Sequence, residues 1–174
     1  MTDSTANAVR DGLIAGLAHA LSNRISTISV VAQTLELGDS DHAALSDMLG
    51  QEVVRLEEIL RLMRLIPTDG RPEPVLISEL MNDAAALARH QRDLRDVKVD
   101  FSGGDDLLPM YGDRAAMLMA VLEAIVEEAR ETKRFAVRWS GTQSAVTVAI
   151  GARELAFATL PEVRRREREG SARG

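Results

Sequence analysis

Two long stretches of helical periodicity, separated by a short break, fill most of residues 1–70 and constrain the fold more than any other feature. In the first, from about Ala6 to Leu37, apolar residues recur at alternating steps of four and three, as they do along the seam of a helical bundle. These residues are Ile14, Ala18, Leu21, Ile25, Ile28, Ala32 and Leu35. The polar run from Gly38 to Asp41 then breaks the pattern.

The second stretch has the same period and ends at Pro67, where a stretch rich in proline and glycine begins. Its apolar positions are Leu45, Leu49, Leu56, Ile59, Met63 and Ile66. Glu52 interrupts this seam with a charge. Two long helices joined by a short loop predict an antiparallel hairpin.

A hairpin of two amphipathic helices cannot cover both of its own apolar stripes. Pairing with a second copy would bury them at the centre of a four-helix bundle, so we predict a homodimer. The alternative is that the stripes pack on the second half of the same chain.

The second half, residues 71–174, has a different sequence pattern, which predicts shorter helices alternating with strands. We predict two helices, from Glu79 to Arg92 and from Asp113 to Thr132, capped by Ser78 and Asp113 respectively. The predicted extended segments are Val97 to Phe101, a short piece near Met110, Phe135 to Trp139 and Ala145 to Ile150. This order indicates a small α/β sandwich. The fold class is therefore α+β and mainly helical, with domains at residues 1–70 and 71–174.

Composition limits the classes of partner. The net charge of -6 and the pI near 5.1 argue against nucleic acid or anionic lipid as partners. The chain has no cysteine, which excludes disulfides and thiolate metal sites. No apolar run approaches the length of a membrane helix, and charges at Asp3, Arg10 and Asp11 interrupt the first segment. We expect a cytoplasmic protein.

One of the three histidines lies where chemistry is possible. His19 comes one position after the seam residue Ala18, so its ring is expected to project from the flank of the first helix toward water. Asn23 follows one turn later on the same strip of surface. A neutral imidazole nitrogen is a nucleophile, and an amide beside it can steady a phosphoryl oxygen or a water. His42 and His90 have no partner at metal-ligand spacing.

The segment Leu17-Ala18-His19-Ala20-Leu21-Ser22-Asn23-Arg24-Ile25 resembles the phosphoacceptor box of dimeric sensor histidine kinases of two-component systems. In that box a histidine is followed by an acid, two variable positions, Asn or Thr, Pro and an aliphatic residue. His19, Asn23 and Ile25 match, whereas Ala20 stands for the acid and Arg24 for the proline. The resemblance implies that His19 accepts a phosphoryl group and that Asn23 supports transfer or hydrolysis.

The second half resembles the ATP-binding domain of the same kinases, but in a degenerate form. Val75 to Leu80 is similar to the entry to that domain, and Met110 to Arg114 is similar to the segment before its nucleotide helix. In the family this helix carries an asparagine that holds magnesium, and the corresponding place here falls at Glu127 or Glu128. After Ile150 there is no Asp-x-Gly-x-Gly pattern and no room for a lid over the phosphates. We expect no ATP and no metal or cofactor of this chain's own.

Three functions remain open. The first is a histidine phosphotransferase that relays phosphoryl groups between response-regulator receiver domains, with His19 as the nucleophile, Asn23 as a supporting amide, and Mg²⁺ supplied by the receiver. The second is a phosphatase of a response regulator, with Asn23 positioning water. The third is a noncatalytic dimeric scaffold that binds a receiver or a kinase. The first is our preferred interpretation, with a receiver domain as partner and a hybrid sensor kinase as a further candidate partner.

Overall fold

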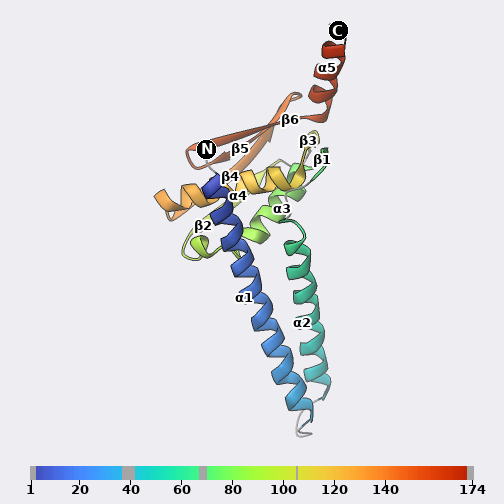
Figure 1. Ribbon diagram of the computed structural model, residues 1–174, viewed down its shortest axis with the longest axis vertical. Helices are drawn as coiled ribbons and strands as arrows, with labels where there is room; N and C mark the ends of the chain where they lie inside the picture. Colours follow the sequence, from blue (N-terminus) through green and yellow to red (C-terminus); the bar gives the residue numbers. More distant parts are fainter. Residues whose placement is uncertain (1–2, 37–41, 67–69, 105, 172–174) are drawn as a thin grey trace.

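A computed structural model describes residues 3–36, 42–66, 70–104 and 106–171. The first half is the predicted hairpin, in which α1 (Asp3–Glu36) runs away from the rest of the molecule and α2 (His42–Met63) returns beside it (Figure 1). Gly38 to Asp41, where we predicted the break, lie outside the described residues, as does Leu37.

The second half packs helices against a small mixed sheet at the upper end of the hairpin (Figure 1). Its elements are β1 (Glu73–Val75), α3 (Ile77–Ala88), the short 3-10 helix η1 (Arg92–Leu94), β2 (Lys98–Gly103), β3 (Met110–Gly112), α4 (Arg114–Glu131), β4 (Arg134–Gly141), β5 (Ala145–Ile150), β6 (Arg153–Ala158) and α5 (Leu160–Ser171). The sheet has the strand order β2-β4-β5-β6, with β2 parallel to β4 and the other pairs antiparallel. A separate two-stranded sheet pairs β1 with β3. The predicted α+β class is confirmed.

Local chemistry explains where these elements begin and turn. Asp113 precedes α4 and its side chain accepts hydrogen bonds from the amides of Ala115 and Ala116, so the predicted cap is confirmed. The hairpin between β5 and β6 turns at Gly151, whose φ of 56° is in the left-handed region that favours glycine.

Three details differ from the sequence prediction. Ser78 does not cap α3, because the helix already begins at Ile77, behind Leu76, and has no side-chain cap. The strands β1 and β6 were not predicted. β1 carries Pro74, which is tolerated because both strands of a two-stranded sheet are edge strands. The charged C-terminal stretch, outside the elements predicted above, forms α5.

The hydrophobic core is continuous between the two halves. Leu13 and Leu17 of α1 are fully buried in one cluster with residues of α3 and α4 such as Leu87 and Leu122. The predicted seam of α1 is not this buried line, since Ile14 and Ile25 on the seam are 45% and 52% exposed. The single chain therefore leaves the predicted seam open, and the division of the chain at residue 70 stays a prediction.

A search of the described helices found none with both the length and the apolarity needed to span a bilayer.

Candidate functional site

His19 lies on the exposed side of α1, with Asn23 one turn further along the helix. The amide nitrogen of Asn23 is 3.3 Å from Nε2 of the His19 ring. Both side chains are exposed, and so are Ser22 and Ser26. The predicted polar strip is therefore present on the exposed surface of α1.

The contact with Asn23 orients the reactive nitrogen. An amide nitrogen only donates, so the bond requires Nε2 to carry the lone pair and Nδ1 to carry the proton when the ring is neutral. Among the described residues no carboxylate forms an ion pair with His19. The arrangement supplies an exposed nucleophilic nitrogen with an amide donor beside it, and no general base.

An ion-pair network joins α1 to α2 just beyond this strip. Nη1 of Arg24 lies 3.2 Å from Oε1 and 3.1 Å from Oε2 of Glu52, and Arg55 contacts the same carboxylate. Glu52 is only 4% exposed. Burial raises the pKa of Glu52, but the hydrogen bonds and charges of Arg24 and Arg55 outweigh burial and hold its pKa below the ordinary value of 4.5. Glu52 is thus ionised and fixed between the helices.

This network explains two departures that the sequence shows separately. Arg24 stands where the box that this segment resembles has a proline, and Glu52 interrupts the apolar seam of α2. The structure brings the two together across 28 positions of sequence. Sequence reasoning missed the pair, although two misplaced opposite charges on facing helices were a usable signal.

The second half presses against α1 one turn before His19. A Cβ atom placed on Gly16 would lie 1.8 Å from the backbone oxygen of His90, so only glycine allows this approach. Next to it, the side chain of Gln91 is buried and donates to the backbone oxygen of Val9 at 3.4 Å. The turn between α3 and η1 is therefore seated on α1 and braces the helix that carries His19.

A buried aspartate ties α2 to the second half. Oδ1 of Asp83 in α3 accepts from Nη1 of Arg61 in α2 at 2.7 Å, and Oδ2 accepts from Nη2 of Arg114 in α4 at 2.8 Å. Arg61 also pairs with Glu58, and Arg114 with Glu79. The bonds to Glu58 and Asp83 raise the pKa of Arg61. One carboxylate thus connects three helices.

Glu127 and Glu128, the positions that the sequence resemblance compares with a magnesium-holding asparagine, lie beside an arginine. Arg153, at the start of β6, lies 2.9 Å from Glu127 and 3.4 Å from Glu131. The side chain of Glu128 packs under the turn at Gly151, where a Cβ atom would meet it at 2.0 Å. The negative charges of Glu127 and Glu131 are therefore paired with the Arg153 side chain.

The other two histidines lie apart from the strip. His42 is exposed at the start of α2, at the far end of the hairpin. His90 is partly buried in the turn on α1, where burial and the neighbouring Arg89 lower its pKa despite the nearby Glu58. Within the described ranges, no group of three or more histidine, aspartate or glutamate side chains could hold a metal ion.

No family model matches the chain, and no curated protein matches it. Several solved structures do. The histidine kinase AdeS of Acinetobacter baumannii matches with a TM-score of 0.37 and 14% identity over 76% of this chain and 71% of that one. A bacterial phosphotransferase matches with a TM-score of 0.44 and 15% identity over 92% of this chain and 73% of that one.

The histidine kinase ThkA, solved in complex with the response regulator protein TrrA, matches with a TM-score of 0.37 and 17% identity over 79% of this chain. This chain spans 43% of the ThkA chain. All three TM-scores lie below 0.5, so the likenesses do not establish a family. The functional case depends on the chain's own residues.

Proposed function

We propose that this chain is a histidine phosphotransferase of two-component signalling, which relays phosphoryl groups to and from receiver domains. The observation that supports the proposal most is the exposed His19 ring with Asn23 donating toward its Nε2. The strip around it is small and polar, so the active site of a receiver can reach Nε2 without displacing any packed side chain.

The transfer needs only groups that the two partners bring. Nε2 of His19 attacks the phosphorus of the receiver's aspartyl phosphate, the acyl P–O bond breaks, and the aspartate leaves as a carboxylate. The ring keeps its proton on Nδ1 and becomes a charged phosphoimidazole, which water can then deprotonate. Asn23 shifts from Nε2 to a phosphoryl oxygen, and Mg²⁺ comes with the receiver. The reverse step passes the group to a second receiver.

The same chemistry leaves room for a phosphatase. Asn23 is within reach of His19, so it could position a water against the aspartyl phosphate of a bound regulator. Free phosphate would then appear without a phosphorylated histidine. This is the second candidate function.

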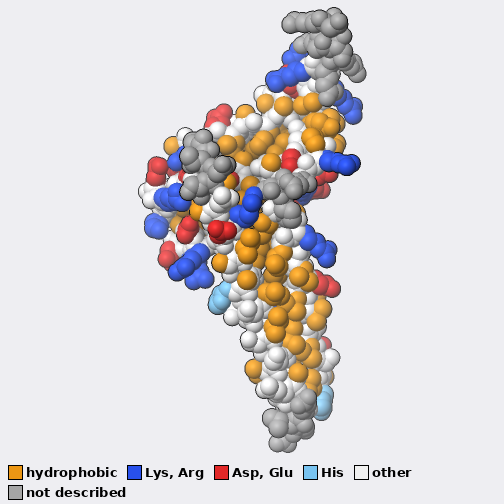
Figure 2. Space-filling view, in the orientation of Figure 1, with side chains coloured by type: hydrophobic (Ala, Val, Ile, Leu, Met, Phe, Trp, Pro, Cys, Tyr) orange, Lys and Arg blue, Asp and Glu red, His pale blue; other side chains and the backbone are white. Residues whose placement is uncertain are grey.

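We infer that the chain acts as a homodimer through the open face of the hairpin. Of the large apolar side chains exposed in the described part of the chain, all but Leu76 and Leu108 lie on α1 or α2. They are Ile14, Ile25, Val30, Met48, Val53, Val54, Leu60 and Met63. Figure 2 shows a continuous hydrophobic stripe with few charges along the hairpin. A second copy that presents the same stripe would bury it as a four-helix bundle.

If the hydrophobic stripe forms the dimer interface, one charged residue placed on it should prevent dimerisation. Ile25→Glu should convert a dimer into a monomer in sedimentation equilibrium, because the carboxylate would be buried without a partner. Leu76→Glu is the matched control, since Leu76 is 46% exposed but lies outside the hairpin. A wild-type monomer at all concentrations, or a dimeric Ile25→Glu variant, would contradict the proposal.

ATP has no place in this scheme. The acids at the family's magnesium position pair with Arg153, and the turn at Gly151 leads directly into β6. Without backbone amides directed at the phosphates, few hydrogen bonds would compensate a bound triphosphate for its lost hydration. The phosphoryl group therefore enters from a receiver.

Incubation with a receiver domain that carries radiolabelled phosphate tests the function. A phosphotransferase acquires an acid-labile label, a phosphatase releases free phosphate, and a scaffold does neither. We expect the label, its loss in His19→Ala, and its retention in His42→Ala, which removes another exposed histidine of the same hairpin. Label that survives in His19→Ala would refute the assignment.

A further inference from the structure

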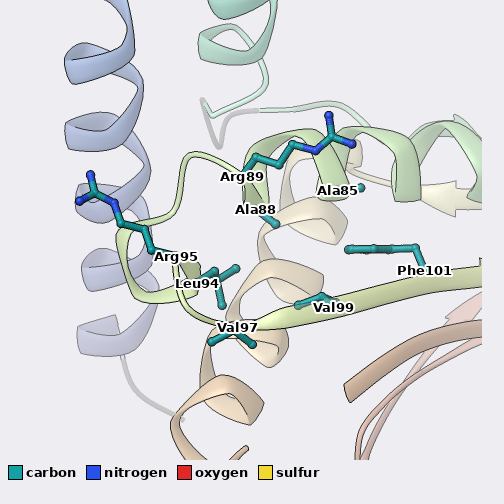
Figure 3. A pocket seen from close by; sticks show the side chains of 8 residues that line it. All are labelled: Ala85, Ala88, Arg89, Leu94, Arg95, Val97, Val99 and Phe101. Atoms are coloured by element: carbon teal, nitrogen blue, oxygen red, sulfur yellow. The ribbon is translucent and has the colours of Figure 1, made fainter. Parts of the chain in front are cut away.

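A pocket of about 400 Å³ lies in the second half, and its lining includes neither His19 nor Asn23. Its floor is apolar and comes from the end of α3, from η1 and from β2 (Figure 3). Figure 3 shows the apolar side chains directed toward one another, with the side chains of Arg89 and Arg95 extending from the margin. The lining also includes the small residues Ala85 and Ala88, which leave the space that larger side chains would fill.

The pocket lies beside the outer edge of β2. β2 is the outermost strand of its sheet, and in the described part of the chain no strand pairs with its other edge. The amide of Lys98 donates to the backbone oxygen of Lys133, so the polar backbone groups of Lys98 face β4. Because this direction alternates along a strand, the amides and carbonyls of Val99 and Phe101 face the open edge. The side chains of the same two residues line the pocket.

The charge at the margin selects the kind of partner. Arg89 and Arg95 are both exposed, and neither guanidinium has a carboxylate within ion-pair distance among the described residues. They are unpaired in a chain whose net charge is -6. An apolar floor between two free cations favours a ligand that alternates apolar and acidic groups.

We propose that the edge of β2 is a docking site for an extended peptide segment of a partner protein, in which apolar side chains alternate with acidic ones. The segment adds as a strand to β2 and exchanges backbone hydrogen bonds with Val99 and Phe101. Its apolar side chains enter the pocket, and its carboxylates meet Arg89 and Arg95. The lining includes neither His19 nor Asn23, so the bound segment would not use the phosphoacceptor side chains.

A labelled synthetic peptide tests the proposal on the whole protein. The probe is an end-blocked peptide of alternating valine and glutamate, followed by fluorescence anisotropy, with a valine and lysine peptide as control. Wild type should bind the acidic peptide and not the basic one. Arg89→Glu combined with Arg95→Glu should weaken binding by about tenfold or more. Arg138→Glu, an exposed arginine of β4 that does not line the pocket, and His19→Ala should bind as wild type does.

Strand addition has a readout of its own. Bound peptide should slow hydrogen exchange at the amides of Val99 and Phe101, and Val99→Pro should abolish binding because it removes an outward donor while keeping the bonds to β4. If Val99→Pro does not fold, exchange on the wild type decides the question. Absent binding, equal binding of the basic peptide, or binding that leaves both amides unprotected would overturn the proposal. Pairing of two copies through this edge would overturn it as well.

Discussion

Asp83→Ala is expected to lower the free energy of unfolding by about 3 kcal/mol, the lower end of the range for breaking a buried ion pair. The side chain of Asp83 is 6% exposed and bonds to two guanidinium groups from different helices. Its removal leaves Arg61 and Arg114 facing each other without the intervening charge. The value falls at the low end because both arginines are partly exposed and can recover some hydration.

Chemical denaturation monitored by circular dichroism measures this effect. Glu58→Ala is the matched control, because Glu58 pairs with the same Arg61 but its side chain is 50% exposed. A surface pair of this kind contributes about 0–1 kcal/mol. If both substitutions cost less than about 1 kcal/mol, Asp83 does not join α2 to the second half in the way described.

Gly16→Ala is expected to destabilise the protein by about 2 kcal/mol, as overpacking does in a tight core. Alanine has the higher helix propensity, by about 1 kcal/mol, so an open position in a helix would gain stability. At Gly16 the new methyl group would overlap the backbone oxygen of His90. A backbone atom cannot rotate away, so the turn between α3 and η1 must move off α1.

Gly50→Ala supplies the opposite expectation within the same hairpin. Gly50 is exposed in α2, and nothing lies within 4 Å of a Cβ atom placed there. We expect this variant to be more stable by about 0.5–1 kcal/mol. Thermal unfolding of the two variants compares them directly. A gain in stability for both would show that the second half does not seat on α1 at Gly16.

Much of the fold follows from local patterns in the sequence. The two seven-residue periods and the break between them predict α1 and α2, and Asp113 marks the start of α4. We did not predict β6, Arg153 to Ala158, because its first two residues are charged and hide the alternation of polar and apolar residues that marks a strand. β1 has three residues and is held by pairing with β3, which is 35 or more positions away in sequence.

Part of the candidate site could also be predicted from local sequence patterns, and part could not. The sequence predicts that His19 and Asn23 are exposed, and both are exposed in the structure, although the seam residue Ala18 beside them is exposed as well. The pairing of Arg24 with Glu52 and the close approach at Gly16 depend on contacts between distant segments, which periodicity cannot reveal. The roles of His19 and Asn23 in phosphoryl transfer stay predictions.

Phosphorus NMR of the protein after incubation with a phosphorylated receiver tests the central claim most directly. We predict a phosphoramidate signal from a histidine phosphorylated at Nε2, absent in His19→Ala and unchanged in His42→Ala. Asn23→Ala should retain the signal but form it more slowly, because no amide then stabilises a phosphoryl oxygen during the transfer. A phosphoramidate that persists in His19→Ala, or release of inorganic phosphate with no phosphohistidine at any time, would contradict the account.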